Sequence, residues 1–182
     1  MIRFMATTTL MSFAEFERLD CDAGQLELLK GELIQIPPAQ NSHLNTSERL
    51  YDLLKTGVEG LRESLPNRQF GRVHMERGYY FSGNPGSWLQ PDVSLTHPGQ
   101  PVDRYYLGAP LIAFEIVSED DRATDLDRKV SVYLTHGAAE VWLIYPTQRH
   151  ALAFDGSGVR NEIHSFHTDL LPGVEIPLDR IL

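Results

Sequence analysis

The chain has 182 residues, with 25 Asp and Glu against 16 Lys and Arg, and its formal net charge is −9. Its 42% hydrophobic and 23% charged residues exclude the collagen-like, disulfide-scaffold and disordered classes. A chain of this length buries roughly 70% of its unfolded surface, which is enough for one sizeable core. We therefore expect a single domain over residues 1–182. The acidic balance also argues against a protein that coats nucleic acid by bulk attraction.

Cys21 is the single cysteine, which excludes an internal disulfide framework and a four-thiolate zinc site. The apolar stretches are strand-length and carry charges, so no membrane segment is expected. The first thirteen residues hold one Arg and no sustained apolar run, which is not the pattern of a signal peptide. These features predict a cytoplasmic protein.

Residues 1–24 are expected to form an N-terminal helical extension. Within it, the spacing of Phe13, Phe16 and Leu19 predicts a short helix over 12–19. Residues 25–36 read as two short strands joined by a tight turn at Lys30-Gly31. The following Pro37-Pro38 ends the second strand, because proline has no ladder N–H.

The next segments change from a helical to a twofold period. Apolar residues at helical spacing predict a helix over 41–64. Alternation then predicts strands over 72–76, 79–81 and 89–96, the last with Leu89, Val93 and Leu95 on one side and Asp92 on the other. Residues 98–110 read as a loop.

The second half of the chain supplies the most buried strand. Residues 110–117 are a continuous apolar run, which is typical of a strand covered on both faces. A helix is expected over 118–137, with Gly137 as its C-cap, and the last two core strands over 140–145 and 150–154. Residues 155–182 form a C-terminal segment. This order of helices and strands indicates an α/β or α+β sheet protein.

Glu115 is the most informative residue, because it lies inside the apolar run Leu-Ile-Ala-Phe-Glu-Ile-Val. An isolated buried carboxylate is costly, so it protonates, pairs or binds a cation. Its neighbours on the same face, Ala113 and Val117, cannot compensate its charge, so a partner must come from another element. A structural ion pair with an arginine and a functional role are about equally compatible with the sequence alone.

Asp92 and Lys129 are the other candidates. Asp92 follows Pro91 on the polar face of its strand, where aspartate is also common for purely structural reasons. Lys129 lies at the margin of the buried helix stripe, so its amine can reach the sheet. The structural alternative for Lys129 is a surface pair with Asp125, four residues earlier. Only Lys30, Lys55 and Lys129 are lysines among the 16 basic residues.

Two carboxylates and a lysine at one sheet edge would suit Mg²⁺, which prefers oxygen ligands and keeps several waters. Such an ion would neutralise the charge of Glu115, polarise a phosphoryl oxygen and lower the pKa of an attacking water. Lys129 would orient that water or stabilise the developing negative charge.

Several consecutive motifs resemble one known family. They are Pro91-Asp92-Val-Ser-Leu, Leu111-Ile-Ala-Phe-Glu115-Ile-Val-Ser118, Asp125-x-x-x-Lys129-x-x-x-Tyr133-x-x-x-Gly137, Glu140-Val-Trp142-Leu-Ile-Tyr-Pro146, and the earlier Glu27-Leu-Leu-Lys-Gly31-Glu32 with His43. Together they resemble the putative restriction endonuclease family, formerly a domain of unknown function, within the PD-(D/E)xK nuclease superfamily. The resemblance spans residues 25–154 and keeps the order of the motifs.

The resemblance implies a restriction-endonuclease-like α/β fold with a mixed β-sheet core flanked by helices. It also implies Mg²⁺- or Mn²⁺-dependent hydrolysis of DNA. Asp92 and Glu115 would be the metal ligands and, with Lys129, the catalytic residues. Glu27, His43 and Asp125 would have supporting roles. The superfamily's usual lysine lies two residues after the second acid, where this chain has Val117, so its role passes to Lys129.

A second reading from a different class is a non-catalytic binding or scaffold protein that keeps the nuclease fold. The acidic charge and the missing lysine at position 117 motivate it. A third is a metal-dependent hydrolase acting on another phosphate ester. Enzymes of the resembling kind often act as dimers, so a homodimer is also expected from the resemblance.

Overall fold

The computed structural model describes residues 10–19, 25–38 and 40–182. Its helices are α1 (Phe13–Phe16), α2 (Asn41–Ser64), α3 (Ala123–Thr135) and the 3-10 helix η2 (Leu178–Arg180). The strands are β1 (Leu26–Leu29), β2 (Glu32–Gln35), β3 (Val73–Met75), β4 (Tyr79–Phe81), β5 (Ser87–Leu89), β6 (Val93–Leu95), β7 (Tyr106–Leu107), β8 (Ile112–Ile116), β9 (Glu140–Tyr145), β10 (His150–Asp155), β11 (Gly158–Glu162), β12 (Ser165–His167) and β13 (Glu175–Pro177).

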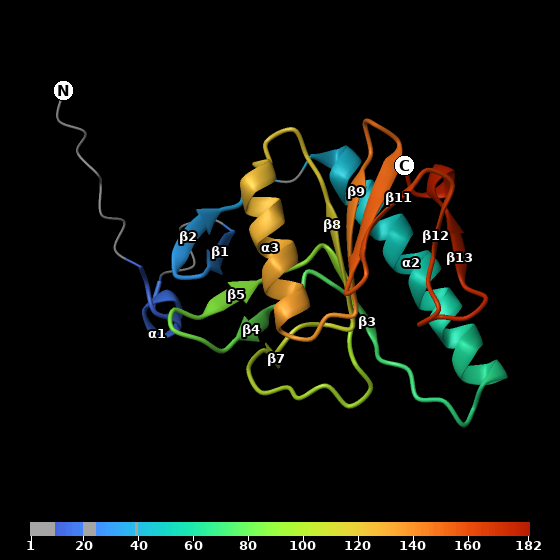
Figure 1. Ribbon diagram of the computed structural model, residues 1–182, viewed down its shortest axis with the longest axis horizontal. Coiled ribbons are helices and arrows are strands. Elements are labelled where there is room, and N and C mark those ends of the chain that lie inside the picture. Colours follow the sequence, from blue (N-terminus) through green and yellow to red (C-terminus); the bar gives the residue numbers. More distant parts are fainter. Residues whose placement is uncertain (1–9, 20–24, 39) are drawn as a thin grey trace.

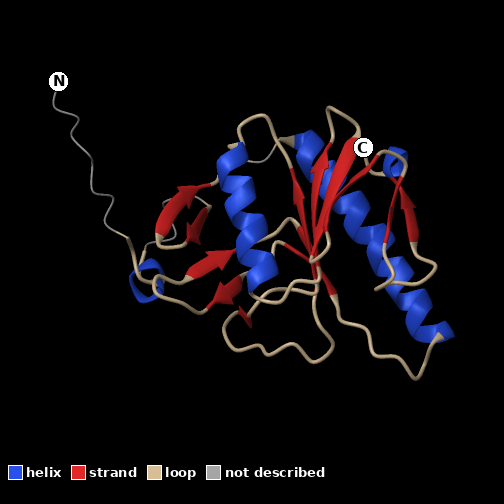
Figure 2. Ribbon diagram, in the orientation of Figure 1, coloured by secondary structure: helices blue, strands red, loops and turns tan. Residues whose placement is uncertain are grey.

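A six-stranded sheet in the order β11-β10-β9-β8-β6-β3 forms the centre of the fold. Strands β8 and β9 are parallel and are connected through α3, whereas the remaining pairs are antiparallel. A five-stranded sheet has the order β2-β1-β5-β4-β7, and β12 and β13 form a two-stranded sheet. Figures 1 and 2 show α2 and α3 on opposite sides of the central strands. The predicted mixed sheet flanked by helices is confirmed.

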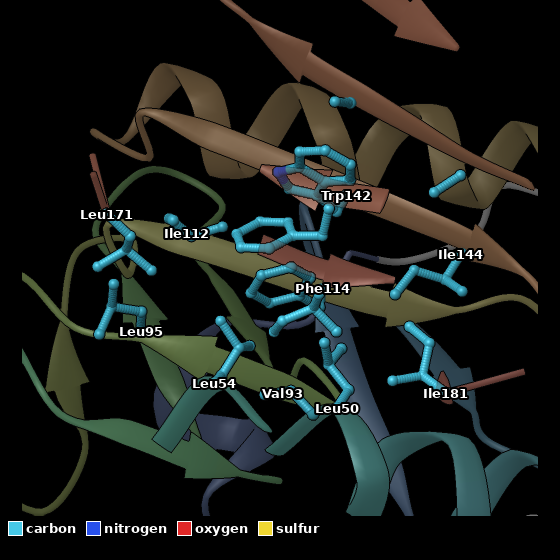
Figure 3. Packing of buried hydrophobic residues seen from close by; sticks show 14 of the residues in the cluster. Leu50, Leu54, Val93, Leu95, Ile112, Phe114, Trp142, Ile144, Leu171 and Ile181 are labelled. Atoms are coloured by element: carbon cyan, nitrogen blue, oxygen red, sulfur yellow. The ribbon is translucent and has the colours of Figure 1, made fainter. Parts of the chain in front are cut away.

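Strand β8 separates two hydrophobic cores by simple alternation. Ile112, Phe114 and Ile116 face α2 and pack in the first core. Figure 3 shows Ile112 and Phe114 in this core with Leu50 and Leu54 of α2. Ala113 faces the other way and packs against α3 and the five-stranded sheet. Because side chains alternate across a strand, Glu115 also faces the α3 side. Its predicted burial is confirmed, since the residue is 6% exposed.

Several predicted elements have the expected bounds or differ from them by one residue at an end. The 41–64 helix is α2, and the strands at 140–145 and 150–154 are β9 and β10. The predicted hairpin is β1 and β2, and Lys30 and Gly31 at its turn have φ of 50° and 80°. Two central residues with positive φ are characteristic of the tight turn that suits the twist of a hairpin.

The predicted strand over 89–96 is wrong. Pro91 lies at its centre and has no N–H for the ladder, and the chain divides there into β5 and β6. The two strands belong to different sheets, so Leu89 packs in the α3 core while Val93 and Leu95 pack in the α2 core. An alternating pattern alone does not reveal such a change of sheet.

Other boundaries also differ. The 118–137 helix begins only at Ala123, because Ser118 and Asp121 form a local turn in which Ser118 N and Oγ donate to the Asp121 carboxylate. The 12–19 helix is limited to α1, and the loop at 98–110 contains β7. Strands β9 and β10 are not the last core strands, because β11 extends the central sheet and Phe166 and Ile176 of β12 and β13 join its core.

The N-terminal helical extension falls partly on residues 1–9 and 20–24, which lie outside the described residues. Within the described part, Ser12 caps α1 in a reciprocal capping box with Glu15. None of the helices in the described part of the chain is long and apolar enough to cross a membrane.

Candidate active site

Glu27 is held on the hairpin strand β1. Its Oε1 accepts a hydrogen bond of 2.8 Å from the Gln90 backbone N–H, just after β5. Arg128 of α3 secures the same hairpin, since its guanidinium lies 2.8 Å from Glu32 of β2 and donates to the Leu29 carbonyl. Glu27 is only 2% exposed. A carboxylate so deeply buried requires a positive partner.

Glu115 receives two contacts from successive turns of α3. The Tyr133 hydroxyl donates to Glu115 Oε1 at 2.7 Å, and Lys129 Nζ donates to Oε2 at 3.1 Å. Lys129 and Tyr133 are four residues apart and therefore lie on one helix face. The expectation that a partner comes from another element is confirmed.

Lys129 joins the two buried carboxylates. Its Nζ lies 2.7 Å from Glu27 Oε2 as well as 3.1 Å from Glu115 Oε2. Burial by itself would lower the pKa of Lys129, but the charges of Glu115 and Glu27 raise the pKa above its usual range. The lysine is therefore an ammonium ion at neutral pH. The predicted alternative, a surface pair with Asp125, is wrong.

Asp92 lies where the chain enters β6, directly after Pro91. Its Oδ2 accepts a hydrogen bond of 2.6 Å from the Ile116 backbone N–H at the end of β8. Its Oδ1 lies 3.3 Å from His43 Nε2 on the first turn of α2. The carboxylate thus links α2, β6 and β8 at one place.

The acidic surroundings of the site change two pKa values. The hydrogen bond to Asp92 raises the pKa of His43 despite partial burial, and the charges of Asp92, Asp121 and Glu115 add to the rise. Burial raises the pKa of the Glu115 carboxyl above its usual value, the positive charge of Lys129 opposes this rise, and the charge of Glu27 adds to it. Neighbouring negative charge thus contributes to both shifts, although burial is the main cause at Glu115 and the hydrogen bond to Asp92 is the main cause at His43.

These side chains share one pocket. It is lined by residues from β1, α2, β8, α3 and the segments between them, namely Gln25, Glu27, Ile36, Pro37, Pro38, Gln40, His43, Glu76, Gln90, Asp92, Glu115, Ile116, Ser118, Asp120, Asp121, Leu126 and Lys129. The structure therefore brings together five of the six residues singled out in the sequence. Asp125 does not line the pocket, and its Oδ1 instead lies 3.3 Å from Arg128 on the same helix.

Three residues of the site are not among those that the sequence predicts: Tyr133, Gln90 and Glu76. Tyr133 follows Lys129 by four residues, a spacing that lets both side chains reach the same partner. Gln90 and Glu76 had no sequence signal. Gln90 supports Glu27 through its backbone, and its side chain donates to the Glu76 carbonyl. Glu76 lines the pocket and has φ of 47°, which is uncommon for a residue with a side chain.

The carboxylates of the pocket are oxygen donors of the kind that divalent cations bind. Among residues 10–19, 25–38 and 40–182, no three His, Cys, Asp or Glu side chains gather closely enough to hold a metal ion by themselves. Mg²⁺, however, often binds through one or two carboxylates and completes its shell with water and substrate oxygens. Asp92 and Glu115 supply two such carboxylates in one pocket. The donor chemistry therefore fits Mg²⁺ or Mn²⁺.

Comparisons with known proteins agree on the kind of fold. A crystal structure from Anabaena variabilis ATCC 29413, described as a "putative nuclease belonging to DUF820", has a TM-score of 0.79 and 18% sequence identity. The match covers 94% of this chain and 97% of that chain. No curated protein matches the sequence. The model of the Uma2 family, described as "Putative restriction endonuclease", matches residues 13–178. The chain therefore belongs to the Uma2 family.

Proposed function

We propose that this protein is a metal-dependent endonuclease of the PD-(D/E)xK type that hydrolyses DNA phosphodiester bonds. The proposal rests on one observation: Asp92, Glu115 and Lys129, from separate elements, line a single pocket. The family and the nuclease-like neighbour support the nuclease class. The DNA substrate, the metal and the roles of individual residues are part of the proposal.

Asp92 and Glu115 are the proposed ligands of Mg²⁺ or Mn²⁺. When bound, the ion would offset the charge of a phosphoryl oxygen and lower the pKa of an attacking water. The hydrogen bond from Ile116 N–H fixes Asp92 Oδ2, which leaves its other oxygen on the side of His43. The Tyr133 hydroxyl fixes Glu115 Oε1 in the same manner. One oxygen of each carboxylate is thus positioned by a neutral donor.

Lys129 has the part of a charged donor in this proposal. Because Glu27 and Glu115 keep it protonated, it cannot remove a proton from water, but it can stabilise negative charge that develops on a phosphoryl oxygen. Its 3.1 Å contact with Glu115 supports the assignment of this role to α3 in place of position 117. Glu27 would position the amine from the opposite side.

Incubation with plasmid and single-stranded DNA in the presence of Mn²⁺ tests the proposal. We expect cleavage that a chelator stops and that Asp92→Ala and Lys129→Ala abolish. A folded protein that binds Mn²⁺ but cuts neither DNA would favour a metal-dependent hydrolase that acts on another phosphate ester. A panel of nucleotide and phosphodiester substrates would then identify its substrate. The location in the cytoplasm and the homodimer remain predictions.

The scaffold alternative has its own structural motivation. Lys129, Glu115 and Tyr133 form a paired buried cluster, which is also what a purely structural role requires. In that case the protein would lack Mn²⁺ binding in a calorimetric titration, and Glu115→Ala would change nothing in that titration. Cleavage lost in Asp92→Ala excludes this alternative.

A further inference from the structure

Strand β3 forms one edge of the central sheet, and an arginine lies at each end of it. Among the residues that the structure describes, β3 pairs with β6 alone, at the end of the order β11-β10-β9-β8-β6-β3. Arg72 precedes the strand and Arg77 follows its last residue by two positions. Both arginines are exposed. Strand β3 is thus a sheet edge with a positive charge at both ends, in a protein whose net charge is −9.

The two arginines differ from their neighbours in their contacts. Arg62 donates to the Phe70 and Gly71 carbonyls, and Arg68 donates to the Leu170 carbonyl, so both hold the chain together. By contrast, neither Arg72 nor Arg77 is within ion-pair distance of a carboxylate in the described part of the chain. The side chains of Arg62 and Arg68 are thus engaged by backbone carbonyls, whereas Arg72 and Arg77 have no carboxylate partner among the described residues.

His74 lies between the two arginines in the sequence, on β3 itself. Its imidazole lies on β3, where Nε2 is 2.9 Å from the Tyr106 hydroxyl. Burial lowers the pKa of His74, and the charges of Arg77 and Arg72 lower it further. Both guanidinium groups thus lie close enough to one imidazole to lower its pKa.

The edge leads directly to the pocket. The Glu76 backbone N–H donates to the Asp92 carbonyl at 3.1 Å, and Glu76 itself lines the pocket beside Arg77 in the sequence. Arg72 lies at the other end, where its backbone N–H donates to Thr96 Oγ1. An extended chain covers at most about 17 Å between positions 72 and 77. A nucleic-acid strand carries a phosphate about every 3.4 Å along the helix axis, so this edge is long enough for several phosphates.

From these observations we infer that Arg72 and Arg77 form a phosphate-binding strip that holds the backbone of a DNA strand along β3 and leads it into the pocket. The inference rests on the proposed nuclease function. Arginine binds phosphate oxygens through its planar fork, and such contacts position nucleic acid without reading its sequence. The pocket itself is rich in carboxylates and would repel a phosphodiester, so attraction must come from beside it.

Binding of labelled single-stranded and duplex oligonucleotides, followed by fluorescence anisotropy in Ca²⁺ at several NaCl concentrations, tests the strip. For Arg72→Ala/Arg77→Ala we expect affinity to fall at least about tenfold. The slope of log K against log salt should become shallower by about 1.8 for duplex and about 1.4 for single strands, since two phosphate contacts are lost. Arg72→Lys/Arg77→Lys should keep the wild-type slope, because the charges remain.

The matched control is Arg180→Ala, an exposed arginine of η2 beside the C-terminal half of α2. It should bind as the wild type does. If the double alanine variant has wild-type affinity and slope, or Arg180→Ala loses as much, the strip is wrong even when the wild type cuts DNA. A wild-type protein that neither binds nor cuts DNA would instead overturn the proposed function together with the strip. Thermal unfolding curves of all variants exclude misfolding as a cause.

Discussion

The ammonium of Lys129 and the carboxylate of Glu115 form a buried ion pair, with Nζ 3.1 Å from Oε2, that joins α3 to the end of β8. A glutamate on the most buried strand is tolerated because this cation lies opposite it. Glu27 shares the same ammonium at 2.7 Å. Three charged groups from three elements thus depend on one another for their burial, and they also line the proposed active site.

Loss of the lysine should destabilise the fold. Lys129→Met removes the ammonium that contacts Glu27 and Glu115, and breaking a buried pair on one side typically costs about 3–5 kcal/mol of unfolding free energy. Urea denaturation measures this loss. Lys129→Met/Glu115→Gln should recover part of the stability but none of the DNA cleavage. A single variant with stability within about 1 kcal/mol of the wild type would contradict the ion pair.

Tyr133→Phe removes one hydroxyl and keeps the packing of the ring. Because that hydroxyl donates to a buried carboxylate, we expect a loss of about 1.5–3 kcal/mol in unfolding free energy and weaker Mn²⁺ binding by calorimetry. The control is Tyr79→Phe, which also removes a buried hydroxyl, in this case one that is hydrogen-bonded to the Ser94 hydroxyl. It should cost about 0.5–1.5 kcal/mol and leave Mn²⁺ affinity unchanged. Equal effects of both variants on Mn²⁺ would refute a positioning role for Tyr133.

Glu27→Gln tests whether Glu27 positions the Lys129 amine for DNA cleavage. The amide oxygen can still accept the hydrogen bond from Gln90, but the charge that holds Lys129 is lost. Groups that orient catalytic side chains typically contribute 10–100-fold, so we expect DNA cleavage to slow by about that factor. Glu162→Gln on β11, where the carboxylate lies 3.5 Å from Arg160, is the control and should cleave at the wild-type rate. An unaffected Glu27→Gln enzyme would remove Glu27 from the account.

Stability should depend on pH through His74. Burial and the charges of Arg77 and Arg72 hold the pKa of His74 below its usual value of 6.5 in the folded state. The unfolded chain therefore takes up the proton first as pH falls, and stability decreases from about pH 6.5 downward until the folded pKa is reached. His74→Gln should flatten this part of a stability–pH curve measured by thermal unfolding. His167→Gln on β12 controls for the replacement of a histidine by glutamine. A stability–pH curve that His74→Gln leaves unchanged would contradict the prediction.

Much of the site could be predicted because the residues next to Glu115 and Lys129 in the sequence already indicate where these side chains lie. Glu115 conflicts with its apolar neighbours, and that conflict alone predicts a partner from another element. Lys129 lies at the edge of a buried stripe, which predicts that its amine reaches the sheet, and the structure confirms this with a 3.1 Å contact. The turn at Lys30-Gly31 likewise follows from local backbone chemistry.

The remaining features depend on contacts between distant parts of the chain. The proximity of Asp125 and Lys129 favours a local pair, but the buried carboxylates of Glu27 and Glu115 attract the ammonium more strongly than a half-exposed aspartate does. The single strand predicted at 89–96 is wrong for a related reason. The alternation of apolar and polar residues indicates an extended chain, but it does not show that the two halves belong to different sheets. Strands β11 to β13 are short and polar in part, so their pairing had no local signal.

The most direct test of the central claim is the single-turnover rate of DNA cleavage by Asp92→Asn at saturating Mn²⁺. Asparagine keeps an oxygen that can accept from Ile116 N–H but removes the charge proposed to hold the metal. We predict a folded variant in which cleavage falls at least about 100-fold, as expected when about 2.7 kcal/mol of transition-state stabilisation is lost. Cleavage by Asp92→Asn at the wild-type rate, or none by the wild type with Mn²⁺, would contradict the account.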